Sequence, residues 1–267
     1  MGYLLLLCWA TTVVAGDLRP AKGWRYRVVA QHLPAVDDIV VSPQGDVYVT
    51  QVLENGDGRI LRVRGGKTDV IANGLNHPRG LLLKKGHVIY VAEQANEGRV
   101  VVINLDNDQR RVIDGLHSPE HIARLPDGDV IVTENGVNGR LVRLLRNGAI
   151  EVITSGLNNP EGLAVAQDGT IFIGESGTGR VLSYKDGTLK VVIDDLDEPS
   201  QIECAPDGVL WVTERGNPGR LLRLKDGTLE TILTGLDDPH GIAVMESGAV
   251  LVTEAGRGRI LVMEPKL

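Results

Sequence analysis

The feature that most constrains the fold of this chain is an internal repeat of about forty residues. A leucine marks each of six copies, and successive leucines lie 39 to 42 residues apart: Leu33, Leu75, Leu116, Leu157, Leu196 and Leu236. Three residues later comes a proline, which Val36 replaces in the first copy. A repeat of this length indicates that one structural unit is built six times and that neighbouring units pack against one another.

Each copy contains four short apolar runs separated by turn residues. In "EGLAVAQDGTIFIGE" two runs flank an Asp-Gly turn, which is typical of a β-hairpin. A third run opens at an arginine, and a fourth run follows a second turn. No apolar period of 3.6 residues persists long enough to predict a substantial helix. Four antiparallel strands per unit are typical of propeller blades, so the sequence predicts an all-β, six-bladed β-propeller.

The two ends of the chain predict how the ring closes. The sixth copy stops after its third strand, at "RILVMEPKL", and residues 24–33 resemble a lone fourth strand placed before the first copy. We therefore expect the N-terminal strand to complete blade 6 and to leave no open edge. The predicted organisation is a signal peptide over 1–15, a short segment over 16–23 and the propeller over 24–267.

The first fifteen residues have the pattern of a secretory signal. An apolar run from Leu4 to Ala15 precedes Gly16 and is too short to span a bilayer. The sequence therefore predicts a secreted or extracytoplasmic protein with no membrane span. Because Cys8 would leave with the signal, Cys204 has no partner for an intrachain disulfide, and we expect it to be a small buried residue.

Composition narrows the class of partner. The 267 residues include 28 basic and 35 acidic side chains, for a net charge of −7, and no basic tract that could follow a phosphate backbone. Nucleic acid is therefore not an expected partner. We expect a monomer that binds either a small-molecule substrate or a protein or glycan ligand.

Two rows of residues are predicted to meet on one face of the ring. If the first strand of each blade runs down the axis from one face of the ring and the second strand runs back up, the first strand starts and the second strand ends at the same face. The end of the second strand carries Gln51, Glu93, Glu134, Glu175, Glu214 and Glu254. An arginine follows each of these within eight residues, so we interpret this row as structural, with charge pairs across the hairpin.

The other row stands directly after the proline position. Its residue type changes from blade to blade, except that two blades both have glutamate. It reads Asp37, Arg79, Glu120, Glu161, Ser200 and His240. A site on the axis of a symmetric ring can be built only by making equivalent positions different. This variable row is therefore the predicted site.

The quoted stretches "PEGLAVAQDGTIFIGESGTGR", "PDGVLWVTERGNPGRLLRL" and "PHGIAVMESGAVLVTEAGRGRI" resemble blades of the NHL, SMP-30/gluconolactonase and streptogramin-lyase propellers, and the resemblance covers residues 24–267. It implies acidic metal ligands in the variable row, with Glu161 as the best match. His240 in "PHGIAV" is similar to the axial base of the lyases. The gluconolactonase-type "EGPxW" opening is absent, and no asparagine occupies the row.

From this resemblance and the chemistry of the row we expect a metal-dependent, lactonase-like hydrolase acting on a small cyclic ester. The expected metal ligands are Asp37, Glu120, Glu161 and His240. The expected catalytic residues are Glu161, His240 and His121. Substrate contacts are expected from Arg79, Ser200, Gln201 and Asp38. Oxygen ligands favour Ca²⁺, with Mg²⁺, Zn²⁺ and Mn²⁺ as alternatives.

Three other interpretations remain open at this point. Converging carboxylates repel one another unless a cation compensates, and Arg79 with His240 could supply that charge in a polar channel without a metal. A streptogramin-lyase-like lyase is the alternative enzyme. An NHL-type binding module for a protein, peptide or glycan is the non-catalytic alternative.

Overall fold

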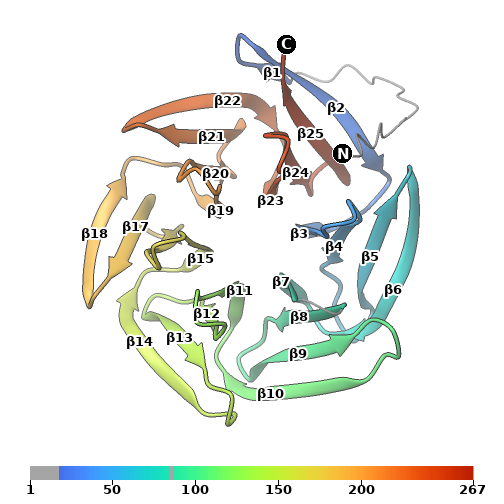
Figure 1. The fold of residues 1–267 in the computed structure, drawn as a ribbon, viewed down its shortest axis with the longest axis vertical. Coiled ribbons are helices and arrows are strands. Elements are labelled where there is room, and N and C mark those ends of the chain that lie inside the picture. Colours follow the sequence, from blue (N-terminus) through green and yellow to red (C-terminus); the bar gives the residue numbers. More distant parts are fainter. Residues whose placement is uncertain (1–17, 85–86, 267) are drawn as a thin grey trace, which may run out of the picture.

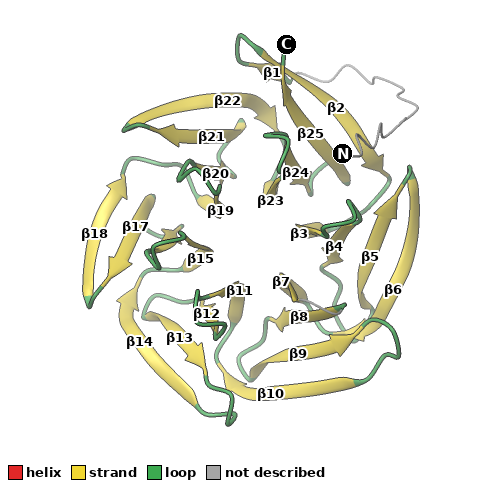
Figure 2. Ribbon diagram, viewed as in Figure 1, coloured by secondary structure: helices red, strands yellow, loops and turns green. Residues whose placement is uncertain are grey.

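The computed structural model describes residues 18–84 and 87–266, and all of its regular elements are strands. The predicted signal peptide, residues 1–15, lies outside the described residues. Six four-stranded antiparallel blades surround a central axis, as predicted (Figures 1 and 2). The described part of the chain contains no helix that is long and apolar enough to cross a membrane.

In blades 1–4 the strands run outward from the axis in chain order, and N-terminal strands are added at the outer edges of blades 5 and 6. Blade 1 comprises β3 (Val36–Val41), β4 (Val47–Gln51), β5 (Gly58–Arg64) and β6 (Lys67–Leu75). Blade 2 comprises β7 (Pro78–Lys84), β8 (Val88–Glu93), β9 (Gly98–Asn104) and β10 (Arg110–Leu116). Blade 3 comprises β11 (Pro119–Arg124), β12 (Val130–Glu134), β13 (Gly139–Leu144) and β14 (Ile150–Leu157). Blade 4 comprises β15 (Pro160–Val165), β16 (Ile171–Glu175), β17 (Arg180–Lys185) and β18 (Thr188–Ile193). Blade 5 comprises β19 (Pro199–Cys204), β20 (Leu210–Glu214), β21 (Gly219–Lys225) and β22 (Thr228–Leu236). Blade 6 comprises β23 (Pro239–Val244), β24 (Val250–Glu254), β25 (Arg259–Pro265) and β2 (Trp24–Gln31).

The N-terminal strand closes the ring as predicted. Strand β2 pairs antiparallel with β25 from Trp24↔Pro265 to Gln31↔Arg259, so both ends of the propeller sequence share blade 6. The segment before it differs from expectation. Instead of lying outside the propeller, β1 (Arg19–Pro20) pairs with β22 and adds a fifth strand to blade 5. Strands β1 and β2 therefore each cover an outer sheet edge.

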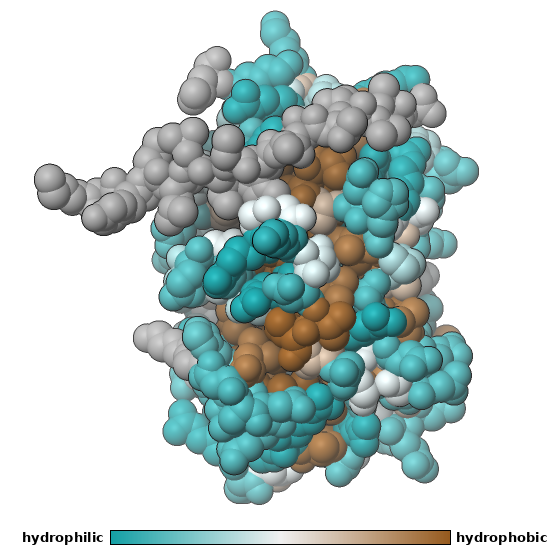
Figure 3. All heavy atoms as spheres, turned by 90° about the vertical axis from the view of Figure 1, so that its right-hand side faces the viewer, coloured by the Kyte–Doolittle hydropathy of each residue, from teal (hydrophilic) through white to brown (hydrophobic). Residues whose placement is uncertain are grey.

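The hydrophobic core consists of six clusters, one at each interface between neighbouring blades. At the interface of blades 6 and 1, for example, Leu251 and Ile260 pack with Ile39 and Val49. Both faces of every blade are therefore buried, which explains the apolar runs of the inner strands. The outer wall is more mixed. Figure 3 shows hydrophobic side chains among hydrophilic ones on one side of the ring. Val70 on β6 is one hydrophobic residue of the described chain that is half exposed.

The row of glutamates is structural, as predicted. In blade 3, Glu134 lies directly opposite Arg140 on the next strand, and Arg140 Nε donates to its carboxylate at 2.5 Å. The other carboxylate oxygen accepts the backbone N–H of His117 at 2.8 Å. The same two contacts recur in four further blades, at Glu93, Glu175, Glu214 and Glu254. Each glutamate therefore ties the linker into a blade to that blade's central hairpin.

Candidate functional site

The variable row gathers around the channel mouth at the face where the inner strands begin. The first residue of each inner strand lies opposite the last residue of the second strand, as in Pro119↔Glu134. Threonine side chains then fix neighbouring blades to one another. Thr133 Oγ1 accepts the N–H of His121 at 3.0 Å and donates to the carbonyl of Glu161 in the next blade at 2.8 Å. We call the six residues Asp37, Arg79, Glu120, Glu161, Ser200 and His240 the rim.

The rim surrounds one small void, as expected for residues that converge on an axis. Five of its members line a space of about 20 Å³, and all five are buried: Asp37, Glu120, Glu161, Ser200 and His240. The sixth, Arg79, is one-fifth exposed at its side chain. A space of this size accommodates one water molecule but no larger ligand. A substrate would therefore lie over the rim rather than pass through it.

Arg79 occupies the position between two of the rim acids. Its Nη1 lies 2.5 Å from Asp37 Oδ2, and its Nε lies 3.5 Å from Glu120 Oε1. Gln94 bridges the same groups, because it accepts a hydrogen bond from Arg79 Nε at 3.2 Å and donates one to Glu120. Although burial disfavours its charge, the carboxylates of Asp37 and Glu120 raise the pKa of Arg79. The guanidinium is thus a permanent cation within the site.

A second arginine neutralises the acid of blade 4. Arg215 Nη2 donates to Glu161 Oε1 at 2.7 Å, and its side chain is about one-fifth exposed. Arg215 lies directly after Glu214 in blade 5, so it reaches the rim from the neighbouring blade. Glu161, the residue expected to be both a metal ligand and catalytic, is therefore held in an ion pair.

His240 is surrounded by oxygen atoms. Its Nε2 lies 3.2 Å from Asp238 Oδ1, and its Nδ1 lies 3.2 Å from Ser200 Oγ and 3.6 Å from Asp37 Oδ2. Burial lowers the pKa of the imidazole, but the two carboxylates outweigh it and the net pKa is raised. When the imidazole is protonated, both ring nitrogens can donate to these oxygen atoms.

Glu120 is the rim acid that is least stabilised in its charged form. Burial, together with repulsion from Glu161 and Asp37, raises its pKa to about 7, although Arg79 and His240 act in the opposite direction. Asp37 differs, since His240 and Arg79 overcome burial and hold its pKa below the usual value. One carboxylate of the rim is therefore fully ionised, while Glu120 exchanges a proton near neutrality.

The donor set does not fit the metal that the sequence suggested. Within residues 18–84 and 87–266, no three His, Cys, Asp or Glu side chains are placed so that they could hold an ion together. Instead, Arg79 and Arg215 lie against the oxygens of Asp37, Glu120 and Glu161. These contacts correspond to the alternative in which cationic side chains of the chain itself balance the acids.

The residue after each rim position forms a second layer below it, which we call the middle layer. Asp38, His121 and Gln201 supply side chains from blades 1, 3 and 5, whereas blades 2, 4 and 6 have Gly80, Gly162 and Gly241. A Cβ on any of these glycines would lie within 2.6–2.7 Å of a backbone oxygen of the next blade. Glycine therefore allows alternate blades to approach closely, while the other three fill the axis.

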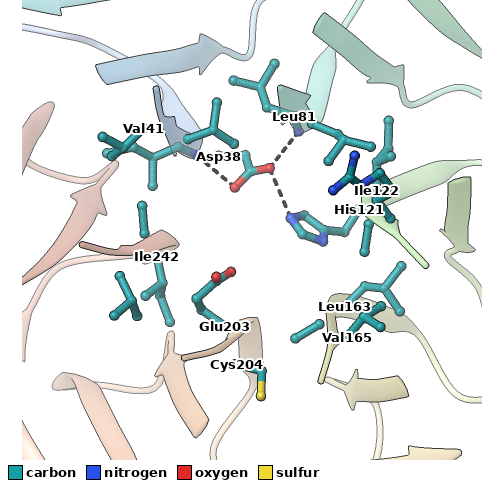
Figure 4. Close-up of a pocket in the computed structure, with 18 residues that line it drawn as sticks. Asp38, Val41, Leu81, His121, Ile122, Leu163, Val165, Glu203, Cys204 and Ile242 are labelled. Carbon is teal, nitrogen blue, oxygen red and sulfur yellow. Dashed lines mark hydrogen bonds and ion pairs between the residues drawn. The ribbon is translucent and has the colours of Figure 1, made fainter. Parts of the chain in front are cut away.

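The middle layer is internally paired. His121 Nε2 lies 3.0 Å from Asp38 Oδ2 (Figure 4). Gln201 Nε2 donates to Asp38 Oδ1 at 3.2 Å. Asp38 also accepts the N–H of Leu81 at 2.6 Å. His121, expected to act as a base, and the expected substrate contacts Asp38 and Gln201 thus lie beneath the rim and bind one another.

Sequence reasoning missed three residues of this network, Gln94, Arg215 and Asp238. A signal for them was present in the same repeat. The position after each structural glutamate also varies between blades, and so does the position before each proline. All six residues before the inner strands have a positive φ, and their carbonyls accept the N–H of the residue after the glutamate position, as in Ala255 N to Asp238 O at 2.9 Å. Three variable positions per blade therefore share this face.

Comparisons with known proteins agree with this architecture. The NHL repeat family model matches residues 236–263, which run from the end of β22 through β23 and β24 into β25. No curated protein matches the chain in sequence. The chain is similar in structure to a gluconolactonase from Xanthomonas campestris, with a TM-score of 0.78 and 15% identity over 96% of this chain and 100% of that one.

Two other solved structures share the fold with different activities. Virginiamycin B lyase from Staphylococcus aureus has a TM-score of 0.65 and 19% identity, covering 85% of this chain and 80% of its own. The PQQ-bound aldose sugar dehydrogenase from Streptomyces coelicolor has a TM-score of 0.74 and 19% identity, covering 92% and 99%. Such distant likeness assigns the architecture but not the reaction. The chain is therefore a six-bladed β-propeller with an NHL repeat, and it shares its fold with gluconolactonases and streptogramin lyases.

Proposed function

We propose that the protein is an enzyme that hydrolyses a small ester, such as a cyclic ester, at the rim, and that it does so by general acid–base catalysis. The observation that carries this proposal is the placement of Glu120 and His240 in blades 3 and 6, which face each other across the axis. One has a pKa of about 7 and the other has a raised pKa. Two titratable groups with different environments are the usual means of providing a base and an acid at the same pH.

The small void supports hydrolysis in particular. It has room for one water molecule beside Glu120, whose ionised carboxylate can remove a proton from that water. The water oxygen then forms a bond to the ester carbonyl carbon, and the bond from that carbon to the ester oxygen breaks. His240 gives its proton to the departing oxygen. The products are a carboxylic acid and an alcohol, joined in one molecule if the ester is cyclic.

The two arginines provide the electrostatic part of the mechanism. Negative charge develops on the carbonyl oxygen of the ester in the transition state, and fixed cations stabilise such charge most strongly where water is excluded. Arg79 and Arg215 are held in place by Asp37 and Glu161, so neither has to reorganise during the reaction. In this proposal they take the part that a divalent ion was expected to play.

Ser200, His240 and Asp238 form a chain of contacts that resembles a nucleophilic triad, but the charges favour another role. Asp37 lies 3.6 Å from the same His240 nitrogen that faces Ser200. That carboxylate favours a proton on Nδ1, so Ser200 accepts a hydrogen bond instead of giving up its own proton. We therefore assign Ser200 to positioning the imidazolium.

The test uses the full chain and a panel of lactones and open-chain esters, with and without a chelator. We expect turnover that the chelator leaves unchanged and that falls by a factor of 10² to 10⁴ in Glu120→Gln and in His240→Asn. Asn135→Ala is the control and should retain activity. Asn135 follows Glu134 in blade 3, as Gln94 follows Glu93 in blade 2. Activity that disappears with chelator and returns with Ca²⁺ would overturn the metal-independent mechanism.

A lyase reaction is the second candidate, because His240 stands in the "PHGIAV" context and the lyase is a structural neighbour. A catalytically inactive His-to-Ala variant of that lyase has been solved with quinupristin. Reaction in water enriched in ¹⁸O separates the two. Hydrolysis places one solvent oxygen in the product, whereas elimination places none. If no ester in the panel turns over, the binding-module alternative gains support, with a protein or glycan ligand on this face.

A further inference from the structure

A second cavity lies on the same axis, beyond the middle layer and away from the rim. Its volume is about 320 Å³, and all six inner strands contribute to its walls (Figure 4). Most of the lining is aliphatic, including Val41, Leu163, Val165 and Ile242. Arg124, at the end of β11, is exposed, so the cavity reaches the face where the inner strands end. This lower cavity is large enough for a small organic molecule.

One residue of the lower cavity departs from the repeat. The fifth position of the inner strand is apolar in five blades, where it is Val40, Leu82, Ala123, Ala164 or Ala243, but blade 5 has Glu203. Glu203 lines the lower cavity, and Figure 4 shows its carboxyl group directed toward the middle of the ring. Nothing in the architecture requires an acid at this position, because the equivalent strands pack with alanine, valine or leucine.

Glu203 is partly buried, and its carboxyl group makes no hydrogen bond or salt bridge with any described residue. Burial and the charge of Asp38 raise its pKa to about 7, His121 acts in the opposite direction, and no hydrogen bond contributes. His121 is the positive group nearest in effect: its Nε2 is paired with Asp38 at 3.0 Å, while its buried Nδ1 makes no hydrogen bond to a described residue. An acid that is costly to ionise and unpaired in a cavity is typical of a site that awaits a ligand.

The other groups facing Glu203 do not supply a positive charge. Cys204 on the same strand is partly buried, and burial and Glu203 raise the pKa of its thiol to about 11, so it stays neutral. Strands β7, β15 and β23 present only aliphatic residues to the cavity. Arg124 of β11 lies at the exposed end and is not among the groups that alter the pKa of Glu203. The lower cavity therefore combines largely apolar walls with one acid that has no hydrogen bond or salt bridge to a described residue.

We propose that the lower cavity binds a small organic cation, with a primary ammonium group on the carboxylate of Glu203 and an aliphatic body against the walls. The ammonium supplies the direct ion pair that Glu203 lacks and donates hydrogen bonds to both carboxylate oxygens. The aliphatic part gains free energy by leaving water. This site is separate from the rim, because the paired middle layer lies between them. It does not depend on the proposed hydrolase activity.

Calorimetric titration of the full chain with hexylammonium, and with hexan-1-ol as the uncharged probe of equal length, tests the proposal. We expect the ammonium to bind wild type at pH 8 at least tenfold more tightly than it binds Glu203→Gln or Glu203→Ala. The alcohol should not distinguish these proteins. Glu203→Ala restores the residue found in three other blades, so it provides a second variant compatible with the fold.

Two further arms locate the site. Glu120→Gln removes an acid from the rim and should leave the affinity for hexylammonium unchanged, as should Glu246→Gln on the exposed surface. Lowering the pH from 8 to 6 should weaken binding to wild type about tenfold, because the ammonium binds the ionised form of Glu203. Equal affinity of wild type and Glu203→Gln, binding lost in Glu120→Gln, or no binding by wild type would each overturn the proposal.

Discussion

The side-chain amide of Gln51 donates a hydrogen bond to the backbone carbonyl of Pro34 at 2.8 Å. In the other five blades this place is held by a glutamate that accepts a backbone N–H from the residue equivalent to Pro34. Proline has no N–H to donate. A glutamate in blade 1 would therefore face a carbonyl oxygen without a proton between them. Gln51 is the one residue of this row that is not glutamate, and Pro34 at the paired linker position explains why.

This relationship predicts a coupled pair of substitutions. Gln51→Glu should lower the free energy of unfolding by about 1–3 kcal/mol, because it places a buried carboxylate against the Pro34 carbonyl. Pro34→Asn restores a backbone donor, so the double variant should recover much of that loss. Chemical denaturation of the four proteins of this cycle measures the coupling. Additive effects of the two substitutions would contradict the explanation.

The fold was predictable because the same pattern of strands and turns recurs in six copies. The position of the leucines, turn glycines and Glu–Arg pairs follows from packing that every blade shares, and the closing strand followed from counting strands. The role of residues 16–23 was not predictable in the same way. Strand β1 has two residues and no counterpart in any other blade, so no repeat could reveal its pairing with β22.

The site was predictable in position more than in chemistry. Variation within the repeat located the rim, and the rim residues do converge. The sequence did not predict which charged side chains would contact one another. Arg215 reaches Glu161 from the next blade, and Asp238 reaches His240 from the preceding linker, through side-chain conformations that strand alternation does not determine. The sequence analysis weighed Arg79 and His240 as balancing charges but not Arg215, which the structure places against Glu161.

The pH dependence of the proposed hydrolysis should report Glu120 and its neighbour Arg79. Because the base acts in its ionised form, kcat/KM should rise with pH through about 7. Arg79 lowers the pKa of Glu120, so Arg79→Met should shift this limb to higher pH in addition to reducing the rate. A pH profile for each protein on one ester measures the shift. An unchanged limb would show that another group is the base.

Removing Arg79 should also leave the negative charge of its neighbouring carboxylates unbalanced. In Arg79→Ala the carboxylates of Asp37 and Glu120 lose the guanidinium between them, so we expect at least tenfold tighter Ca²⁺ binding than in wild type. Arg124→Ala is the matched control, since it removes one exposed arginine outside the rim. Calcium titration by calorimetry compares the three proteins. Wild type binding Ca²⁺ as tightly as Arg79→Ala would support the metal site expected from the sequence.

The unpaired acid of the lower cavity should influence stability as well as binding. The pKa of Glu203 is about 7 in the folded protein and near the usual 4.5 in the unfolded chain. Between these values the folded state holds a proton that the unfolded state has released, so the stability present below pH 4.5 is lost as pH rises through 7. Relative to Glu203→Gln, wild type should lose up to about 3 kcal/mol of unfolding free energy between pH 4 and pH 8. Urea denaturation of both proteins across this range measures the difference, and the contributions of titratable groups common to both proteins largely cancel.

Hexylammonium at pH 8 should restore part of the lost unfolding free energy in wild type only. A stability difference between the two proteins that is independent of pH would show that Glu203 is solvated or paired in the folded protein.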